Sequence, residues 1–216
     1  MNHKAAGKKI TTPTEITKKE NIKKILFVCT GNTCRSCMAE AIFNKLMSDI
    51  QQNVLLPEDQ HSFELKLTLE NHQSNYKYIA FSRGLCAYNS PASENAVKCA
   101  GKLYGADLKK HISKNISEKD IKDAELVLTM TEQHQNILRN SFHHHSEKIF
   151  TLKEYCGKFT ESDSLKTSGR EHPIKIQQYK YTHDIQDPYG GDIDMYMSCA
   201  KEIGNCIEIL IKNLNS

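Results

Sequence analysis

Cys29 and Arg35 stand at the two ends of a short segment that has the features of an anion-binding loop. An apolar run ends at Cys29, a loop containing Gly31 and Asn32 follows, and helix-forming residues begin beyond Arg35. A loop between a strand and a helix turns successive backbone N–H groups inward, and the helix start adds its unpaired donors and its dipole. The segment therefore predicts a site that binds phosphate or a similar anion.

The side chains of this loop supply a nucleophile and the groups that would hold its substrate. Cys29 is expected at the floor of the loop, where the positive field favours the thiolate and makes the cysteine a nucleophile. Arg35 offers a planar fork to two phosphate oxygens. We expect Gly31 to provide unrestricted backbone dihedrals and Asn32 a left-handed conformation. The predicted phosphate-binding residues are Thr30, Gly31, Asn32, Thr33, Cys34, Arg35 and Ser36.

Short apolar strands alternate with helices along the rest of the chain. Strands are predicted over residues 24–28, 78–82, 125–130 and 148–152, and helices over 36–50, 90–103, 117–121, 131–140 and 192–214. The predicted start signals of three of these helices are Ser90-Pro91, Ser117 and Asp192. The alternation predicts an α/β fold in which helices flank a doubly wound, four-stranded parallel sheet. The strictly alternating residues 63–69 allow an added antiparallel edge strand.

A single domain is expected, because 216 residues with 38% hydrophobic and 25% charged content can bury one proper core. Residues 1–22 are polar and rich in lysine, and we predict that they form a disordered basic arm. The domain then spans residues 23–216, with insertions near 51–77 and 158–182. The arm carries no aromatic residues, so no nucleic-acid partner is expected. The pattern makes no prediction of oligomeric state.

The cysteine content and the hydropathy indicate a cytoplasmic protein. The chain has 8 cysteines but no apolar signal segment, which favours free thiols over a disulfide scaffold. No apolar run approaches the ~18 residues that span a membrane. Cys34 and Cys37 form a lone CxxC, and residues 143–145 are three histidines without ligand spacing, so no metal is expected.

The loop, taken with Asp187-Pro188-Tyr189 near the C-terminus, resembles the low-molecular-weight protein tyrosine phosphatase family. The resemblance extends to Ser82-x-Gly84 and to the segment Leu126-Val127-Leu128-x-Met130, and it covers roughly residues 24–214. Thr33, together with Met38-Ala39-Glu40 and residues 150–155, looks most like the protein arginine phosphatase branch. In that branch a threonine at the position of Thr33 goes with a preference for phosphoarginine.

The resemblance implies a reaction in which the Cys29 thiolate attacks phosphorus while Arg35 holds the equatorial oxygens. Asp187 protonates the leaving group and then activates water to hydrolyse the phosphocysteine. We prefer Asp187 to Asp184 as this acid because a proline follows it. The reaction requires no cofactor, and its substrates are phosphorylated proteins. The catalytic residues are therefore predicted to be Cys29, Arg35 and Asp187.

Further roles follow for residues around the predicted nucleophile. The resemblance implies that Ser36 donates a hydrogen bond to the thiolate, and that Thr33 and Tyr189 select the substrate. Cys34 lies within the same tight loop and is a candidate redox partner of Cys29.

Two residues depart from the family's pattern. Cys37 stands where proline is usual, and Arg83 stands where a small residue is usual. We expect Arg83 to reach the rim of the pocket.

Other functions stay open at this point. A tyrosine phosphatase of the same fold is the nearest alternative. A thiol oxidoreductase would use Cys34-x-x-Cys37 at a helix start, but this reading leaves Cys29, Arg35 and Asp187 unexplained. An arsenate reductase of the same fold needs a relay of further cysteines, and Cys86 is not obviously placed for one. A phosphate-binding module without turnover would be expected to lack the nucleophile or the acid.

Overall fold

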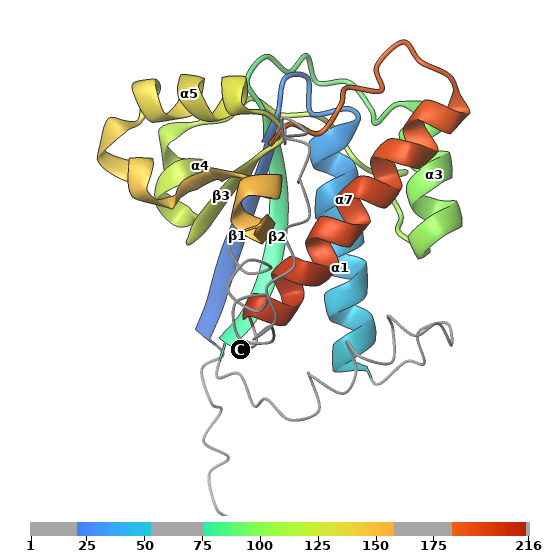
Figure 1. Cartoon of the computed structure of the whole chain (residues 1–216), viewed down its shortest axis with the longest axis horizontal. Coiled ribbons are helices and arrows are strands. Elements are labelled where there is room, and N and C mark those ends of the chain that lie inside the picture. The colour runs from blue at the N-terminus through green and yellow to red at the C-terminus, as the bar shows by residue number, and fades with distance from the viewer. Residues whose placement is uncertain (1–20, 53–75, 158–182, 215–216) are drawn as a thin grey trace, which may run out of the picture.

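The protein is described from a computed structural model that covers residues 21–52, 76–157 and 183–214 (Figure 1). Its 4-stranded sheet is entirely parallel, with the strand order β2-β1-β3-β4. The strands are β1 (Asn21–Cys29), β2 (Tyr76–Gly84), β3 (Leu126–Thr129) and β4 (Ile149–Thr151). The helices are α1 (Arg35–Gln51), α3 (Glu94–Tyr104), α4 (Glu118–Asp123), α5 (Glu132–Ser141), the 3-10 helix η1 (His143–Lys148) and α7 (Ile193–Leu214). The predicted doubly wound α/β fold is confirmed.

The sheet separates two hydrophobic layers, because successive side chains of a strand point to opposite faces. In β1, Ile25 and Phe27 pack with α1, α3 and α7, whereas Leu26 and Val28 pack with α4 and α5. Figure 1 shows these two groups of helices on opposite sides of the sheet. Both faces of β1 are therefore buried, as expected for an inner strand of a parallel sheet.

Three predicted boundaries can be compared with the elements. β1 begins at Asn21, so the last residues of the predicted arm belong to the sheet. α1 ends at Gln51 and β2 begins at Tyr76, which leaves the first insertion between them. The rest of the arm, the possible edge strand at 63–69 and the whole second insertion at 158–182 lie outside the described residues. None of the described helices is long and apolar enough to cross a membrane.

Side-chain caps start the helices around the site. Ser117 and Asp120 form a reciprocal capping box at the start of α4, and Asp192 Oδ1 accepts a hydrogen bond from Met195 N at 3.0 Å at the start of α7. Both starts agree with the prediction. Thr131 caps α5 by accepting a hydrogen bond from the third residue of that helix.

The start of α3 differs from the prediction. Its N-cap is Ser93, whose Oγ accepts a hydrogen bond from Ala96 N at 3.3 Å. Ser90 and Pro91 precede the helix, and Pro91 pairs with Ile112 in an isolated antiparallel bridge. Both serines carry the same local capping signal. The bridge to a distant segment decides between them, because it holds the chain extended past the first serine.

The carboxyl ends of the strands bring the loops together at one edge of the sheet. Cys29 pairs with Gly84, and Val28 pairs with Thr129, so β1, β2 and β3 end at nearly the same level. In Figure 1 the loops that follow these strands and the segment that precedes α7 meet at the top of the molecule. This edge is where open parallel sheets place their ligands.

Candidate active site

The loop between β1 and α1 is held in shape by Asn32. This residue is fully buried and has a φ of 56°, which confirms the predicted left-handed conformation. Its Nδ2 donates to Ser36 Oγ at 3.0 Å and to Ser82 Oγ at 2.7 Å, while its Oδ1 accepts from Lys114 N at 3.0 Å. The side chain thus ties the loop to β2 and to the segment that follows α3.

Gly31 does not have a positive φ. A Cβ placed there would meet Thr33 Oγ1 at an ordinary contact distance of 3.6 Å. The left-handed turn of the loop is at Asn32, so the conformation of the loop does not depend on the backbone freedom that Gly31 offers.

Cys29 lies at the floor of this loop. Its Sγ is 3.0 Å from Ser36 Oγ and accepts a hydrogen bond from Asn32 N at 3.3 Å. The residue is 2% exposed, and it ends β1 at the edge of the sheet. The predicted contact between Ser36 and the thiol is present. A backbone N–H donor and a hydroxyl within hydrogen-bond distance of one sulfur form an arrangement that can stabilise a thiolate.

Arg35 joins this loop to the segment before α7. Its Nη1 donates to Ile185 O at 3.1 Å, and its Nη2 forms an ion pair with Asp187. Nε is buried and has no hydrogen-bond partner among the described residues. A buried guanidinium N–H without a partner is costly, so this donor is available to an anion in the loop.

Asp187 is brought to the site by the residue two positions before it. Ile185 is fully buried, and its N–H donates to Met130 O at 2.8 Å at the end of β3. The Asp187 side chain remains 48% exposed, and its Oδ1 accepts from Tyr189 N at 3.2 Å. Asp184, the competing carboxylate, accepts instead from Glu132 N at 2.7 Å at the start of α5.

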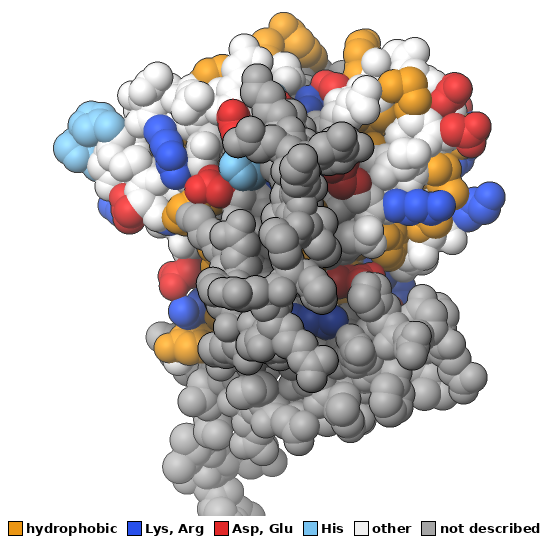
Figure 2. Space-filling view, viewed as in Figure 1, with side chains coloured by type: hydrophobic (Ala, Val, Ile, Leu, Met, Phe, Trp, Pro, Cys, Tyr) orange, Lys and Arg blue, Asp and Glu red, His pale blue; other side chains and the backbone are white. Residues whose placement is uncertain are grey.

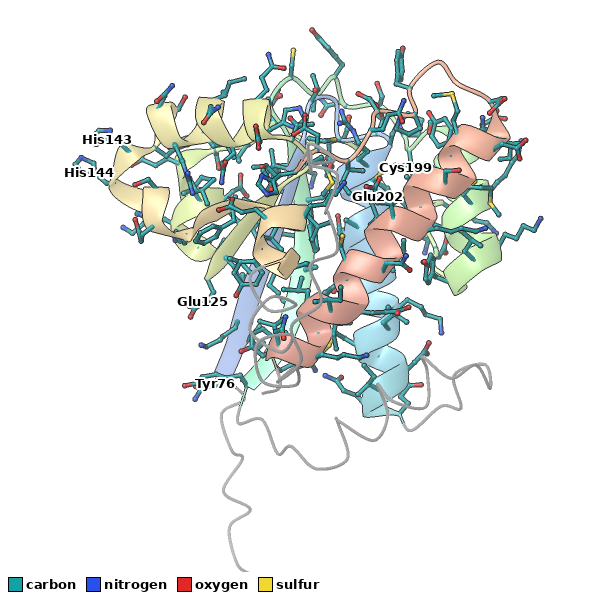
Figure 3. The ribbon with its side chains drawn as sticks, in the orientation of Figure 1. Tyr76, Glu125, His143, His144, Cys199 and Glu202 are labelled. Carbon is teal, nitrogen blue, oxygen red and sulfur yellow. The ribbon has the colours of Figure 1, made fainter. Side chains whose placement is uncertain are left out.

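α7 supports the same segment from below. Lys153 pairs with Glu202 at 2.8 Å and also donates to Asp184 O at 3.3 Å. Figure 3 shows Glu202 and Cys199 on the part of α7 that lies under the segment. The segment before α7 thus contacts the end of β3 on one side and is linked to α7 through Lys153 on the other. These contacts bring Asp187 to Arg35, although the two residues are far apart in the sequence.

A cavity of about 710 Å³ opens above the loop. Most of the predicted site residues line it, and the exceptions, Asn32 and Ser36, are fully buried. The predicted residues that line it are Cys29, Thr30, Gly31, Thr33, Cys34, Arg35, Asp187 and Tyr189. Figure 2 shows hydrophobic side chains gathered at this end of the molecule.

Two tyrosines stand at the mouth of this cavity. Tyr189 is 77% exposed and Tyr88 is 78% exposed. Tyr88 was missed by the sequence analysis. The signal that could have found it is an aromatic residue shortly after Ser82-x-Gly84, in a loop that the parallel pairing of β2 with β1 must bring to the site.

The CxxC pair does not present two accessible thiols. Cys34 Sγ lies 3.2 Å from Tyr196 OH and donates to Ser93 Oγ at 3.5 Å, whereas Cys37 Sγ donates to Cys34 O at 3.1 Å. Complete burial raises the pKa of the Cys37 thiol well above its usual value. This geometry counts against a redox couple of Cys34 with Cys37. A regulatory disulfide between Cys29 and Cys34 stays a prediction.

Arg83 does not reach the rim of the cavity, and that expectation is wrong. Its Nε donates to Asp120 Oδ1 at 3.1 Å, and its Nη1 donates to Ser82 O at 2.8 Å. Burial opposes ionisation of Asp120, but hydrogen bonds from Ser117 and Arg83 outweigh it and lower the pKa of the carboxyl. Arg83 is therefore a structural partner of α4 rather than a substrate contact.

His134 is a second residue that the sequence analysis missed. Its Nε2 lies 2.8 Å from Thr30 Oγ1, and both residues line a further cavity of about 530 Å³ beside the first. The histidine occupies the first turn of α5, where the local pattern gives no sign of a contact with the loop. His143 and His144 belong to the run of three histidines in the sequence. They lie in η1, at the outer edge of the molecule and away from the phosphate-binding loop (Figure 3). No group of three or more His, Cys, Asp or Glu in the described ranges is arranged to hold a metal ion.

Comparison with known proteins supports one family. The sequence profile of "Low molecular weight phosphotyrosine protein phosphatase" matches residues 24–54 and 77–172. The chain is 32% identical to the protein-arginine-phosphatase of Bacillus subtilis, over 88% of this chain and 95% of that protein. It is 29% identical to the low molecular weight protein-tyrosine-phosphatase PtpB of Staphylococcus aureus, over 85% of this chain and 94% of that protein.

Solved structures lead to the same conclusion. The low molecular weight protein tyrosine phosphatase from T. tengcongensis aligns with a TM-score of 0.63 and 32% identity, over 88% of this chain and 99% of that one. A mutant of YwlE from Bacillus subtilis aligns with a TM-score of 0.62 and 29% identity, over 90% of this chain and 99% of that one. The chain belongs to the low molecular weight phosphotyrosine protein phosphatase family.

Proposed function

We propose that this protein hydrolyses phosphoarginine in proteins, with Cys29 as the nucleophile and Asp187 as the general acid and base. Membership of the family makes the chain a cysteine-dependent protein phosphatase, and the proposal concerns its residues and its leaving group. One observation carries it: Cys29 Sγ, which lies 3.0 Å from Ser36 Oγ and accepts from Asn32 N at 3.3 Å, lines the same cavity as the Arg35–Asp187 ion pair. The proposal includes the cytoplasmic location predicted above.

The first step is an in-line displacement at phosphorus. The Cys29 thiolate forms the sulfur–phosphorus bond while the bond to the leaving group breaks. Backbone N–H groups of the loop and the unpartnered Nε of Arg35 hold the equatorial oxygens, on which the transition state spreads its charge. The remaining nitrogens of Arg35 are already fixed by Ile185 O and Asp187, so the guanidinium is oriented before the substrate arrives.

Asp187 serves both steps of the reaction. The phosphate dianion competes for the Arg35 guanidinium and releases the Asp187 carboxylate, which takes up a proton from solvent and then gives it to the departing nitrogen. Once the leaving group has gone, the same carboxylate removes a proton from the water that attacks phosphocysteine. The position of Asp187 in the cavity wall and its 48% exposure give it access to both the substrate and the water.

The choice of phosphoarginine rests on two polar side chains in the cavity wall, Thr33 and Asp187. Thr33 lines it with a small side chain, and its Oγ1 makes only a long contact of 3.6 Å with Cys34 Sγ within the described residues. A hydroxyl with a free lone pair suits a guanidinium better than an aromatic ring. Once it has given up its proton, the Asp187 carboxylate also offers charge pairing to the departing guanidinium. The arginine phosphatase of Bacillus subtilis, which is 32% identical, supports the same choice.

Phosphotyrosine is the second candidate substrate, and a specific observation favours it. Tyr88 and Tyr189 expose aromatic rings at the mouth of the cavity, where they can stack on a phenol ring. The relative in Staphylococcus aureus named as a protein-tyrosine-phosphatase is 29% identical.

Release of phosphate from matched phosphoarginine and phosphotyrosine peptides tests the proposal. Wild type should favour phosphoarginine. Cys29→Ser should abolish turnover, and Asp187→Ala should slow it by roughly 10²- to 10⁴-fold, the range for general acid catalysis. Thr33→Ile should shift the ratio of kcat/KM values towards phosphotyrosine.

Matched controls lie in the same region. Cys86→Ser removes an exposed thiol of the same cavity, and Asp184→Ala removes the neighbouring carboxylate that caps α5. Both should keep turnover within about 3-fold of wild type, a change below 1 kcal/mol in barrier height. Full activity in Cys29→Ser would contradict the mechanism, and an unchanged substrate ratio in Thr33→Ile would remove the main support for phosphoarginine.

A further inference from the structure

A buried histidine of α5 contacts the phosphate-binding loop. α5 packs on the face of the sheet opposite to α1, the helix that follows this loop. His134 lies in the first turn of α5 and is 5% exposed, and its Nε2 is 2.8 Å from Thr30 Oγ1. Thr30 follows the proposed nucleophile directly. The proposed mechanism does not use the contact between His134 and Thr30, although this contact joins a titratable side chain to a residue that lines the cavity.

The surroundings of His134 determine its protonation state. Burial and the nearby Arg35 guanidinium lower its pKa to about 4, so the imidazole is neutral at neutral pH. Its Nδ1 is buried and has no partner in the described part of the chain. A proton on Nδ1 would be a buried N–H without an acceptor, so we assign the proton to Nε2. In this tautomer His134 donates to Thr30.

Thr30 occupies the partition between the two cavities. The residues that line both the 710 Å³ and the 530 Å³ cavity are Thr30, Arg35 and Asp187. Thr30 is therefore on the same side of the main cavity as the proposed general acid, where the leaving group departs. A hydroxyl that accepts from His134 keeps one hydrogen and one lone pair for the substrate.

We propose that His134 is a positioning residue that fixes the Thr30 hydroxyl for a guanidinium leaving group and so favours phosphoarginine over phosphotyrosine. This inference rests on the proposed function. A guanidinium N–H donates to the remaining lone pair of Thr30, and the hydroxyl hydrogen is free for a phosphoryl oxygen. A phenol ring offers no donor and leaves this remaining lone pair unpaired. Unpaired polar groups in a site are a strong basis for discrimination.

The test compares kcat/KM on matched phosphoarginine and phosphotyrosine peptides. Thr30→Val should lower the phosphoarginine value by about 10-fold or more, the loss expected for a hydrogen bond to a charged group. His134→Leu should lower it by about 3- to 10-fold, because the hydroxyl stays but is no longer oriented. The phosphotyrosine value should fall by a clearly smaller factor than the phosphoarginine value in both variants, because only the guanidinium uses the lone pair of Thr30. His134→Gln, whose amide N–H reaches Thr30, should restore the wild-type ratio.

A double variant shows whether His134 acts through Thr30. In the Thr30→Val background, His134→Leu should have no further effect on either substrate. Gln133→Leu is the matched control, because Gln133 neighbours His134 on α5 and lines the 530 Å³ cavity. It should leave the substrate ratio unchanged. An equal loss on both substrates, or a full His134→Leu effect without the Thr30 hydroxyl, would overturn the proposal.

Nitrogen-15 NMR of the imidazole tests the assignment independently of activity. At pH 7, His134 of wild type should show a protonated Nε2 and an unprotonated Nδ1. A proton on Nδ1, or on both nitrogens, would overturn the proposal even if His134→Leu folds poorly.

Failure of the proposed function is distinguishable from failure of this inference. A wild type that prefers phosphotyrosine contradicts the proposed function. A wild type that prefers phosphoarginine, with a ratio unmoved by His134→Leu, contradicts only the role of His134.

Discussion

At the scale of single residues, the site depends on polar side chains that are buried and nearly all paired. Asn32 satisfies its side chain with contacts on the loop, on β2 and beyond α3. The exceptions near the site are Arg35 Nε and His134 Nδ1, both buried without a partner in the described residues. In the proposed mechanism the arginine donor binds a phosphate oxygen. His134 Nδ1 carries no proton to donate, because the imidazole beside the Arg35 guanidinium is neutral and its proton is assigned to Nε2.

The lowered pKa of His134 predicts how stability changes with pH. Burial and Arg35 bring the pKa from 6.5 to about 4 in the folded state. Between these values the unfolded chain binds a proton that the folded chain does not, so the free energy of unfolding falls as pH falls. The whole contribution is up to about 3 kcal/mol, fully present above pH 6.5 and lost by about pH 4.

Urea unfolding of wild type and His134→Gln between pH 7 and pH 4 measures this contribution. Glutamine does not titrate, so the difference in unfolding free energy between the two proteins should change in this window, with wild type losing more. Parallel curves would contradict the assignment of the lowered pKa.

At the scale of elements, the site sits where a strand ends and a helix begins, and neighbouring elements hold that junction. α7 packs on α1 and α3, and the caps at Ser93 and Asp192 fix where the two outer helices start. These starts matter because Ser93 Oγ and Tyr196 OH contact Cys34 inside the loop. The positions at which α3 and α7 begin therefore affect contacts inside the phosphate-binding loop.

Gly204 allows the close contact of α7 with α3. A Cβ at this position would lie 1.8 Å from Tyr104 OH and 2.2 Å from the ring carbon that bears it. Gly204→Ala should therefore lower the free energy of unfolding by about 1–3 kcal/mol, despite the better helix propensity of alanine. Denaturant unfolding measures the change.

Gly101→Ala is the matched control within α3, because its Cβ would meet nothing closer than Ala106 O at 3.8 Å. That variant should be stabilised by about 0.5–1 kcal/mol. In a Tyr104→Leu background, Gly204→Ala should lose most of its cost. A cost that persists there would show that the tyrosine ring is not its cause.

At the scale of the whole molecule, the site joins segments from three regions of the chain. The loop after β1, the segment after β2 and the segment before α7 all line the main cavity. An anion that binds there contacts Arg35, which is itself tied to the segment before α7. Binding should therefore stabilise the folded molecule as a unit.

Inorganic phosphate should raise the Tm of the full chain. At about 100 times its Kd, a ligand that binds only the folded state contributes about 2.7 kcal/mol, or about 5–10 °C for a chain of this size. Thermal unfolding with increasing phosphate measures the shift. Arg35→Lys keeps the charge but loses the fork and Nε, so its shift should be much smaller. An equal shift in both proteins would place the anion elsewhere.

Much of the fold and part of the site follow from local sequence. The continuous apolar run of β1 and the helical spacing of apolar residues in α1 predict these elements, because each pattern lies within a few neighbouring residues. The loop is likewise contiguous, so Cys29, Asn32 and Arg35 must share one site in any strand-loop-helix arrangement. Local capping signals did not determine where α3 begins, because Ser90 and Ser93 carry the same signal and the helix is capped by Ser93.

The sequence by itself determined the phosphate loop and its cysteine, the alternation of strands and helices, and the presence of a carboxylate near the C-terminus. Only the tertiary structure decided the partners that lie far apart in the chain. Arg35 meets Asp187 because Ile185 is buried against β3, and Arg83 turns to Asp120 rather than to the cavity. His134 reaches Thr30 across the sheet edge. Such pairings depend on how parallel strands and their crossover helices pack, which no local pattern records.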